Sequence, residues 1–286
     1  NAGDAIASGG NYNTVVGNEA GTAITTGDNN TAVGFEALAT EDADGNNTAV
    51  GYRALKTLNA GTDADNVAVG KDAGLSVTTG IRNTLIGGRA GDALTDADFN
   101  VAIGEQALTS DTKGNKTTAV GQSSLASQNH TSSTDTHNTA VGHNSGLSVT
   151  TGQNNTIVGS LAGDALTTGG NNVAIGIEAL SGDTTGSNST AIGRNALFAQ
   201  NFTGDENSEN TAVGSLAGQS VTSGQQNTLM GMGAGGSITT GSANICIGRE
   251  AAAGSNDISG ETPITTGSGN VIIGKACQAH AANAST

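Results

Sequence analysis

Asn138-Thr139-Ala140-Val141-Gly142 is one copy of a five-residue motif that recurs along the whole chain and decides its fold. The motif glycine returns fifteen times between Gly17 and Gly274, and ten of the fourteen intervals are 17 residues long. This period is too short for helical-hairpin or propeller-blade repeats. It suits one turn of a β-solenoid, with one or two short strands and tight corners. The sequence therefore predicts an all-β chain, a parallel β-roll of about 15 turns.

A longer period of four turns is superimposed on the 17-residue period. The residue four places after the motif glycine follows the order Gly, Gly, Leu, Leu through most of the chain. Residues 70–141 and 142–213 align as two blocks of 72 residues, which indicates duplication of a four-turn unit. We therefore expect residues 1–286 to form a single continuous solenoid. Because the chain begins within the pattern, we interpret it as a fragment of a longer protein.

The composition limits the possible function classes. The chain has 286 residues, of which 45 are Gly, 1 is Pro and 2% are aromatic. One large core built on aromatic side chains is therefore excluded. The net charge of −15 argues against nucleic acid and against anionic membranes, since both bind basic surfaces. No apolar run approaches the roughly 20 residues of a membrane span, so no membrane insertion is expected.

The motif also predicts how each strand faces. The residue before the glycine and the residue two places earlier share one face, which we place in the solenoid core. The middle residue points the other way and is never polar, although a solvated strand face should be polar. This stripe therefore predicts a homo-oligomer interface, and Asp at Ala174 is expected to block assembly without loss of β-structure. Its members include Val15, Ala32, Ala49, Leu85, Ala102, Ile157, Ala174, Leu229 and Ile272.

Asparagine and glycine frame each motif. Asn occupies the first position in 13 of 15 copies, with Thr117 and Ser189 as the exceptions. Asn tolerates left-handed backbone and bonds nearby backbone groups, and stacked Asn side chains can form a ladder. The motif glycine is expected to end the strand, where a corner needs positive φ or close backbone approach.

At this point the residues resemble a known family. The Asn-Thr-Ala-Val/Ile-Gly-x-x-Ala unit resembles the head repeats of trimeric autotransporter adhesins, which are left-handed parallel β-rolls wound as trimers. The longer unit over residues 142–156 is even more similar to repeats in tail-fibre proteins of aquatic bacteriophages, cyanophages included. The resemblance covers essentially the whole chain. It implies a left-handed solenoid and a homotrimer, and it favours the trimer over a dimer.

The sequence shows no catalytic constellation. It has no Cys-x-x-Cys, no His-Glu-x-x-His and no phosphate-binding loop ending in Gly-Lys-Ser/Thr. His130 and His137 with Asp135 could bind a metal, but solvated loop residues are the better interpretation, as they are for the acidic corner at Asp42–Asp44. We therefore expect no enzyme activity, no metal and no cofactor.

Ligand recognition is expected where the repeat is interrupted, because loops tolerate insertion and carry function. The insertions are Asn59–Asp65, Gln128–His137, Gln200–Glu209 and Gly254–Thr266, and they share one phase of the four-turn period. Polar loops of this kind could bind glycans, although inert bulges are the simpler interpretation. The candidate ligand residues are Asp63, Asp65, His130, Asp135, His137, Phe202, Asp205 and Glu206.

Four functions compete. The resemblance, together with an acidic repeat that contains no catalytic motif, favours a role as the shaft or receptor-approaching part of a phage tail fibre or spike. Such a fibre is at the virion surface and approaches a glycan or protein receptor on the host. The alternative is the head of a bacterial trimeric adhesin at the cell surface. An ice-binding solenoid requires an exposed array of threonines. A polysaccharide-cleaving enzyme requires a carboxylate pair in a groove, and none is visible.

Overall fold

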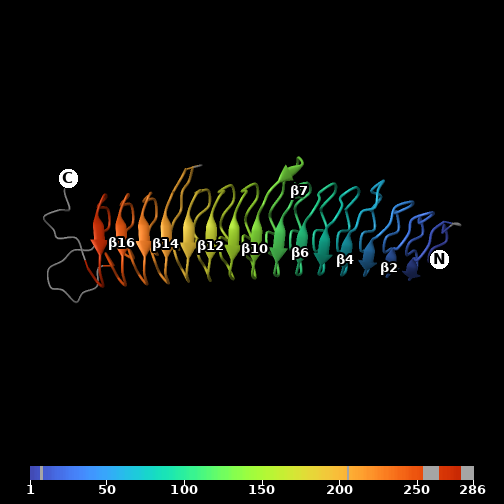
Figure 1. The fold of residues 1–286 in the computed structure, drawn as a ribbon, viewed down its shortest axis with the longest axis horizontal. Helices are drawn as coiled ribbons and strands as arrows, with labels where there is room; N and C mark the ends of the chain where they lie inside the picture. Colours follow the sequence, from blue (N-terminus) through green and yellow to red (C-terminus); the bar gives the residue numbers. More distant parts are fainter. Residues whose placement is uncertain (7–8, 205, 254–263, 278–286) are drawn as a thin grey trace. The chain divides into compact units, whose positions relative to one another are not determined.

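The computed structural model describes residues 1–6, 9–204, 206–253 and 264–277 (Figure 1). Within these ranges the secondary structure consists of strands, turns and bends, with no helix. The chain separates into two compact units, Asn1–Val141 and Gly142–Thr286. The boundary falls between the two blocks of 72 residues that the four-turn period defines.

The first unit is built on a parallel sheet of eight strands. Each strand has three residues, and its neighbours come from the preceding and following turns. A short second sheet pairs β7 (Gly114–Asn115) with β9 (Thr134–Asp135). The strands of the main sheet are β1 (Thr14–Val16), β2 (Thr31–Val33), β3 (Thr48–Val50), β4 (Val67–Val69), β5 (Thr84–Ile86), β6 (Val101–Ile103), β8 (Thr118–Val120) and β10 (Thr139–Val141).

The second unit repeats this architecture with seven parallel strands. They are β11 (Thr156–Val158), β12 (Val173–Ile175), β13 (Thr190–Ile192), β14 (Thr211–Val213), β15 (Thr228–Met230), β16 (Ile245–Ile247) and β17 (Val271–Ile273). Equivalent motif positions pair across neighbouring turns, as Ala174 does with Ala191. The predicted all-β parallel solenoid is therefore confirmed, with about 14 turns over the two units. Its left hand and its trimeric state stay predictions.

An asparagine ladder, buried in most turns, closes the turns that carry the motif asparagine, as the sequence predicts. Asn66 is an example: its Nδ2 donates to the carbonyl of Gly80 at 2.8 Å, across the turn. Its Oδ1 accepts a hydrogen bond from the backbone N–H of Asn83, in the next turn, at 2.8 Å. The asparagine amide thus satisfies backbone groups that the short strands leave without a partner.

The motif glycine is fixed by its neighbour in the next turn. Gly87 has φ of +135°, and a β-carbon there would lie 2.4 Å from the carbonyl oxygen of Gly104. The same close approach repeats in both units, for example between Gly176 and Gly193. A side chain at this position is therefore excluded both by the backbone conformation and by the stacking of turns.

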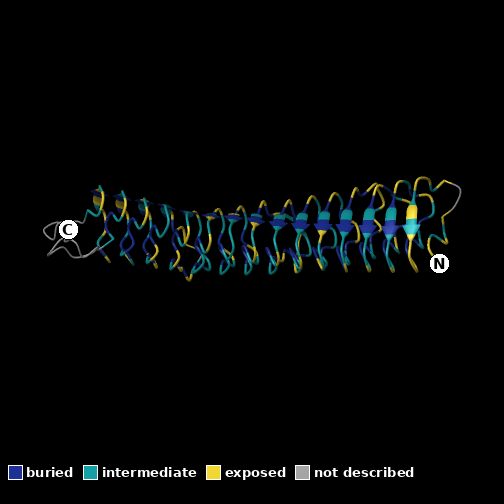
Figure 2. Cartoon of the chain, turned by 90° about the horizontal axis from the view of Figure 1, so that it is seen from below, coloured by how far each residue is buried: buried dark blue, intermediate teal, exposed yellow. Residues whose placement is uncertain are grey.

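The middle residue of each strand lies in the core, opposite to the sequence-based expectation. The predicted interface residues Ala32, Ala49, Leu85, Ala102, Ile157, Ala174 and Leu229 are 0% exposed, Ile272 is 5% exposed, and Val15 in the first strand is half-buried. The assignment of the two faces was therefore wrong, and Figure 2 shows the alternation along the strands. The stripe is apolar because the rest of its own turn covers it.

The large members of this stripe fill space that glycines leave open. A β-carbon on Gly91 would lie 2.8 Å from Cδ2 of Leu85, and one on Gly163 would lie 3.4 Å from Cδ1 of Ile157. In the Leu turns of the four-turn period the same position holds a leucine, and Leu55 adopts φ of +47° there. The four-turn period is thus a packing period of the core: a large strand residue beside Gly, a small strand residue beside Leu.

Candidate functional site

The outward side of each sheet is an extended, uncharged surface of the described chain. We call it the outer face and define it as the first and third residues of each main-sheet strand. It contains only Thr, Val, Ile and Met, and no residue of either column carries a charge. In the first unit it comprises Thr14, Val16, Thr31, Val33, Thr48, Val50, Val67, Val69, Thr84, Ile86, Val101, Ile103, Thr118, Val120, Thr139 and Val141. In the second unit it comprises Thr156, Val158, Val173, Ile175, Thr190, Ile192, Thr211, Val213, Thr228, Met230, Ile245, Ile247, Val271 and Ile273.

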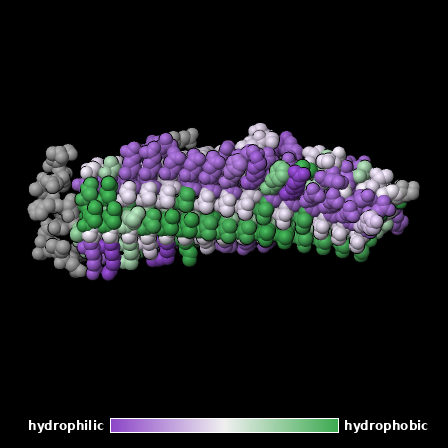
Figure 3. All heavy atoms as spheres, in the orientation of Figure 1, coloured by the Kyte–Doolittle hydropathy of each residue, from purple (hydrophilic) through white to green (hydrophobic). Residues whose placement is uncertain are grey.

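These side chains are half-buried or exposed in the single chain. Ile86 is 37% exposed and Met230 is 45% exposed, whereas Leu85 and Leu229 beside them are 0% exposed. Figure 3 shows the hydrophobic third positions as a band along the strands of each unit, with a paler band beside it. Hydrophilic residues lie beyond the paler band. An uncharged surface of this extent on a chain with a net charge of −15 makes the outer face the candidate interaction site.

An aromatic pair extends the exposed apolar surface just beyond strands β2 and β3. Phe35 and Tyr52 each follow a motif glycine, and their rings stack with centroids 5.4 Å apart. The guanidinium of Arg53 lies 4.8 Å from the centroid of the Tyr52 ring. Asp72 holds that guanidinium in place, with Nε of Arg53 donating to its Oδ1 at 2.8 Å. The pair is therefore a partly exposed, stacked aromatic patch.

The insertion loops turn two of their predicted ligand residues inward. His130 is 5% exposed and Phe202 is 2% exposed. Asp63, Asp65, His137 and Glu206 are exposed, and so is Asp135, which forms an ion pair with Lys116; Asp205 lies outside the described residues. Within the described ranges, His130, Asp135 and His137 do not form a metal-binding cluster. The predicted ligand residues are therefore not brought together in one site.

A buried carboxylate anchors the second insertion loop. Asp111 is 0% exposed, and its Oδ1 accepts a hydrogen bond from the backbone N–H of His130 at 2.9 Å. Its Oδ2 accepts one from Nε2 of Gln128 at 2.6 Å. Gln128 also donates to Oγ1 of Thr117 at 3.0 Å and accepts from Nδ2 of Asn138 at 2.8 Å. Burial by itself raises the pKa of Asp111, but the contacts with His130 and Gln128 outweigh burial and lower it.

The third insertion loop has the same anchor. Nε2 of Gln200 donates to Oδ2 of Asp183 at 2.5 Å and to Oγ of Ser189 at 2.9 Å. The backbone N–H of Phe202 donates to Oδ1 of Asp183 at 3.2 Å. Thr117 and Ser189, the two exceptions to the motif asparagine, are thus the residues that receive the glutamine amide. The sequence signal for these anchors is a polar residue in the otherwise apolar column seven places after the motif glycine.

The first four-turn unit has different side chains at the positions that correspond to the anchor residues Asp111 and Gln128. Glu41 takes the place of Asp111, but Leu58 takes the place of Gln128, so no amide faces the carboxylate. Glu41 is 0% exposed, and one of its carboxylate oxygens lies within 4.8 Å of a carboxylate oxygen of Asp42 and one of Asp44. We call these three residues the acidic corner. Burial, and then the charge of Asp44, raise the pKa of Glu41 to about 7.

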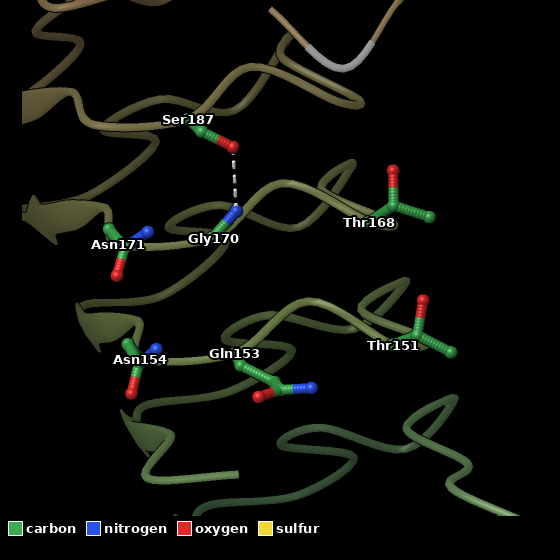
Figure 4. Close-up of a pocket in the computed structure, with 7 residues that line it drawn as sticks. All are labelled: Thr151, Gln153, Asn154, Thr168, Gly170, Asn171 and Ser187. Atoms are coloured by element: carbon green, nitrogen blue, oxygen red, sulfur yellow. Dashed lines mark hydrogen bonds between the residues drawn. The ribbon is translucent and has the colours of Figure 1, made fainter. Parts of the chain in front are cut away.

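A shallow polar hollow lies in the second unit. It has a volume of about 490 Å³ and is lined by Thr151, Gln153, Asn154, Thr168, Gly170, Asn171 and Ser187. Figure 4 shows these residues along successive turns, where the Ser187 hydroxyl accepts from the Gly170 N–H at 3.0 Å. The lining contains no titratable side chain. The hollow is therefore the groove between stacked turns and has no titratable acid or base in its lining.

Comparison with known protein families, curated proteins and solved structures finds no match for this chain. Among the described residues no helix is long and apolar enough to cross a membrane.

Proposed function

We propose that this chain is a structural segment of a fibre, assembled from copies of itself through the outer face. The observation that supports this is the uncharged pair of columns, half-buried or exposed, on the sheets of both units. The hollow in the described part of the second unit is lined by no titratable side chain. The repeated architecture suits an elongated structural protein, because turns can be added without changing the core.

A second and third copy of the chain are the partners that fit this surface best. Side chains in each column repeat at the strand spacing of about 4.8 Å. A partner surface can contact every strand in the same way only if its own side chains repeat at that spacing. Fifteen strands, each about 10 Å long, present roughly 700 Å². Stable interfaces bury about 800 Å² on each partner, so the two outer faces nearly suffice for self-association.

We propose a homotrimer, in keeping with the resemblance to adhesin heads and phage tail fibres. A three-fold arrangement lets each chain direct its outer face toward a common axis. The charged corners then stay in solvent, where the net charge of −15 per chain keeps the assembly soluble. The proposed location is the virion surface, on a tail fibre or spike that approaches a host glycan or protein. The head of a bacterial surface adhesin is the alternative.

Two adjacent residues of β12 test the outer face against the core. Asp at Ile175, combined with Asp at Ile192 in β13, places charges on the outer face, and should abolish association while retaining the far-UV β signal. Asp at Ala174 places a charge in the core and should unfold the second unit, because a buried unpaired carboxylate is costly. Light scattering and circular dichroism measure both. A double variant that keeps the native mass would refute the proposed interface.

Ice binding is a second candidate, favoured by one specific observation. The first position of the outer face is Thr in ten of the fifteen main-sheet strands, and these threonines are half-buried or exposed rather than enclosed. Their hydroxyls therefore form a regular array at the surface of each unit. Thermal hysteresis of the purified chain tests this candidate. Absence of hysteresis at millimolar concentration would exclude it, and association through the outer face would cover the array.

A further inference from the structure

The acidic corner contains a buried carboxylate with an unsatisfied oxygen. Oε1 of Glu41 accepts a hydrogen bond from the backbone N–H of Asp44 at 3.3 Å. Oε2 of Glu41 has no hydrogen-bond partner, and neither has the buried Oδ2 of Asp44. Buried polar atoms are nearly always satisfied in folded proteins, so two unsatisfied carboxylate oxygens side by side require an explanation.

The corner also lacks a balancing charge. No Lys or Arg forms an ion pair with Glu41, Asp42 or Asp44 in the part of the chain that the structure describes. Three carboxylates whose ligand atoms lie within 4.8 Å of one another repel each other, most strongly where burial lowers the dielectric. A bound cation removes the repulsion and satisfies the unpaired oxygens together.

The two equivalent corners show what a satisfied carboxylate looks like in this fold. Asp111 and Asp183 each accept from a glutamine amide and from the backbone N–H of a glycine three residues later. In the first four-turn unit Leu58 replaces the glutamine and Asp44 replaces the glycine. The first four-turn unit therefore lacks the glutamine amide donor and has the additional carboxylate of Asp44 at the same corner.

We propose that Glu41, Asp42 and Asp44 bind one Ca²⁺ ion at this corner of the first unit. Ca²⁺ takes six to eight oxygen ligands at about 2.3–2.6 Å and accepts carboxylates in irregular arrangements. Three carboxylates supply three to six of these oxygens, and water completes the shell on the side where Asp42 is exposed. Mg²⁺ demands stricter octahedral geometry and gives up water reluctantly, so the corner favours Ca²⁺.

Isothermal titration of the full chain with CaCl₂ tests the proposal. We expect one site with a dissociation constant of about 0.1–1 mM, in the range of extracellular Ca²⁺ modules, and binding of MgCl₂ at least tenfold weaker. Asp44→Asn should weaken Ca²⁺ binding at least tenfold. Glu105→Gln is the matched control, since it removes an exposed acidic charge in another turn of the same unit, and should bind as the native chain does.

A second variant guards against loss of folding. Leu58→Gln gives Glu41 the amide that Asp111 and Asp183 already have, so the fold accommodates it elsewhere. The far-UV spectrum should stay native while Ca²⁺ binding weakens at least tenfold, because the amide competes for the carboxylate. A native chain that binds no Ca²⁺ would overturn the proposal. So would equal binding by the native chain, Asp44→Asn and Leu58→Gln, which would reveal only diffuse attraction to a negative surface.

Discussion

Leu85 occupies the space that Gly74 leaves open: a β-carbon on Gly74 would lie 2.7 Å from Cδ1 of the leucine. The contact joins neighbouring turns, β4 to β5, in the core of the first unit. Leu229 stands in the same relation to Gly218 in the second unit, at 2.6 Å. Large strand residues are therefore core residues matched to glycines, and this match makes the four-turn period.

Leu85→Ala should destabilise the first unit by about 2–5 kcal/mol, the usual cost of removing a buried leucine from a site that cannot collapse. The glycines opposite cannot refill the cavity, because they carry no side chain. Ile86→Thr is the control, since it changes an outer-face residue to a type that other strands carry at the surface. In the unassociated chain, at a concentration too low for copies to bind one another, it should cost less than about 1 kcal/mol. Urea denaturation followed by circular dichroism measures both. Equal effects would contradict the assignment of faces.

Gly87 and its neighbour Gly88 give a matched pair for the backbone. Gly87→Ala should cost about 2 kcal/mol or more, because its φ of +135° and the carbonyl of Gly104, 2.4 Å from the new β-carbon, both exclude a side chain. Gly88→Ala should be neutral within about 0.5 kcal/mol, since a β-carbon there meets nothing within 4 Å. Thermal unfolding midpoints compare the two. A neutral Gly87→Ala would show that the turns do not stack this closely.

The fold could be predicted from the sequence because each turn repeats the same small set of constraints. The motif glycines predict close stacking of turns, which Gly87 confirms. The motif asparagines predict a ladder that closes the turns, which Asn66 confirms. The period then gives the parallel pairing and the approximate number of turns, with about 15 expected and about 14 found. None of this depends on which face of the strand is inside.

The faces could not be predicted, because both sides of each main-sheet strand carry apolar side chains and neither side carries a charge. Alternation of polar and apolar residues along a strand identifies the inner side only when the outer side is polar. A strand in which Val or Ile stands beside Ala is compatible with either side facing the core. The deciding contact, that of Leu85 with Gly74, joins residues of different turns and is not visible from strand patterning. The loop anchors were missed for a related reason: Asp111 and Gln128 look like surface residues until the column to which they belong is seen to be buried.

Acid should weaken the first unit through Asp111. The native pKa of this carboxyl is lowered, whereas an unfolded Asp titrates near about 3.9. The native state therefore binds fewer protons than the unfolded state as the pH falls below about 4, and the stabilisation present at neutral pH is lost there. Asp111→Asn should flatten the fall in stability between about pH 5 and pH 2. Glu105→Gln controls for general charge, and an unchanged acid limb in Asp111→Asn would contradict this role.

The two cysteines should differ in reactivity. Cys246 is a middle strand residue, 0% exposed, and burial raises the pKa of its thiol to about 11. Cys277 is partly exposed. At pH 8 a thiol reagent should modify one cysteine per native chain rapidly, identified by peptide mapping as Cys277, and both after denaturation. Rapid native modification of Cys246 would mean that the middle stripe is accessible.

The mass of the native chain in solution tests the central proposal most directly. Sedimentation equilibrium over a hundredfold range of concentration should give about three times the chain mass of 27.7 kDa, with assembly maintained at high salt because the outer face carries no charge. A mass of 27.7 kDa throughout that range would contradict the proposal that copies of the chain cover the outer face.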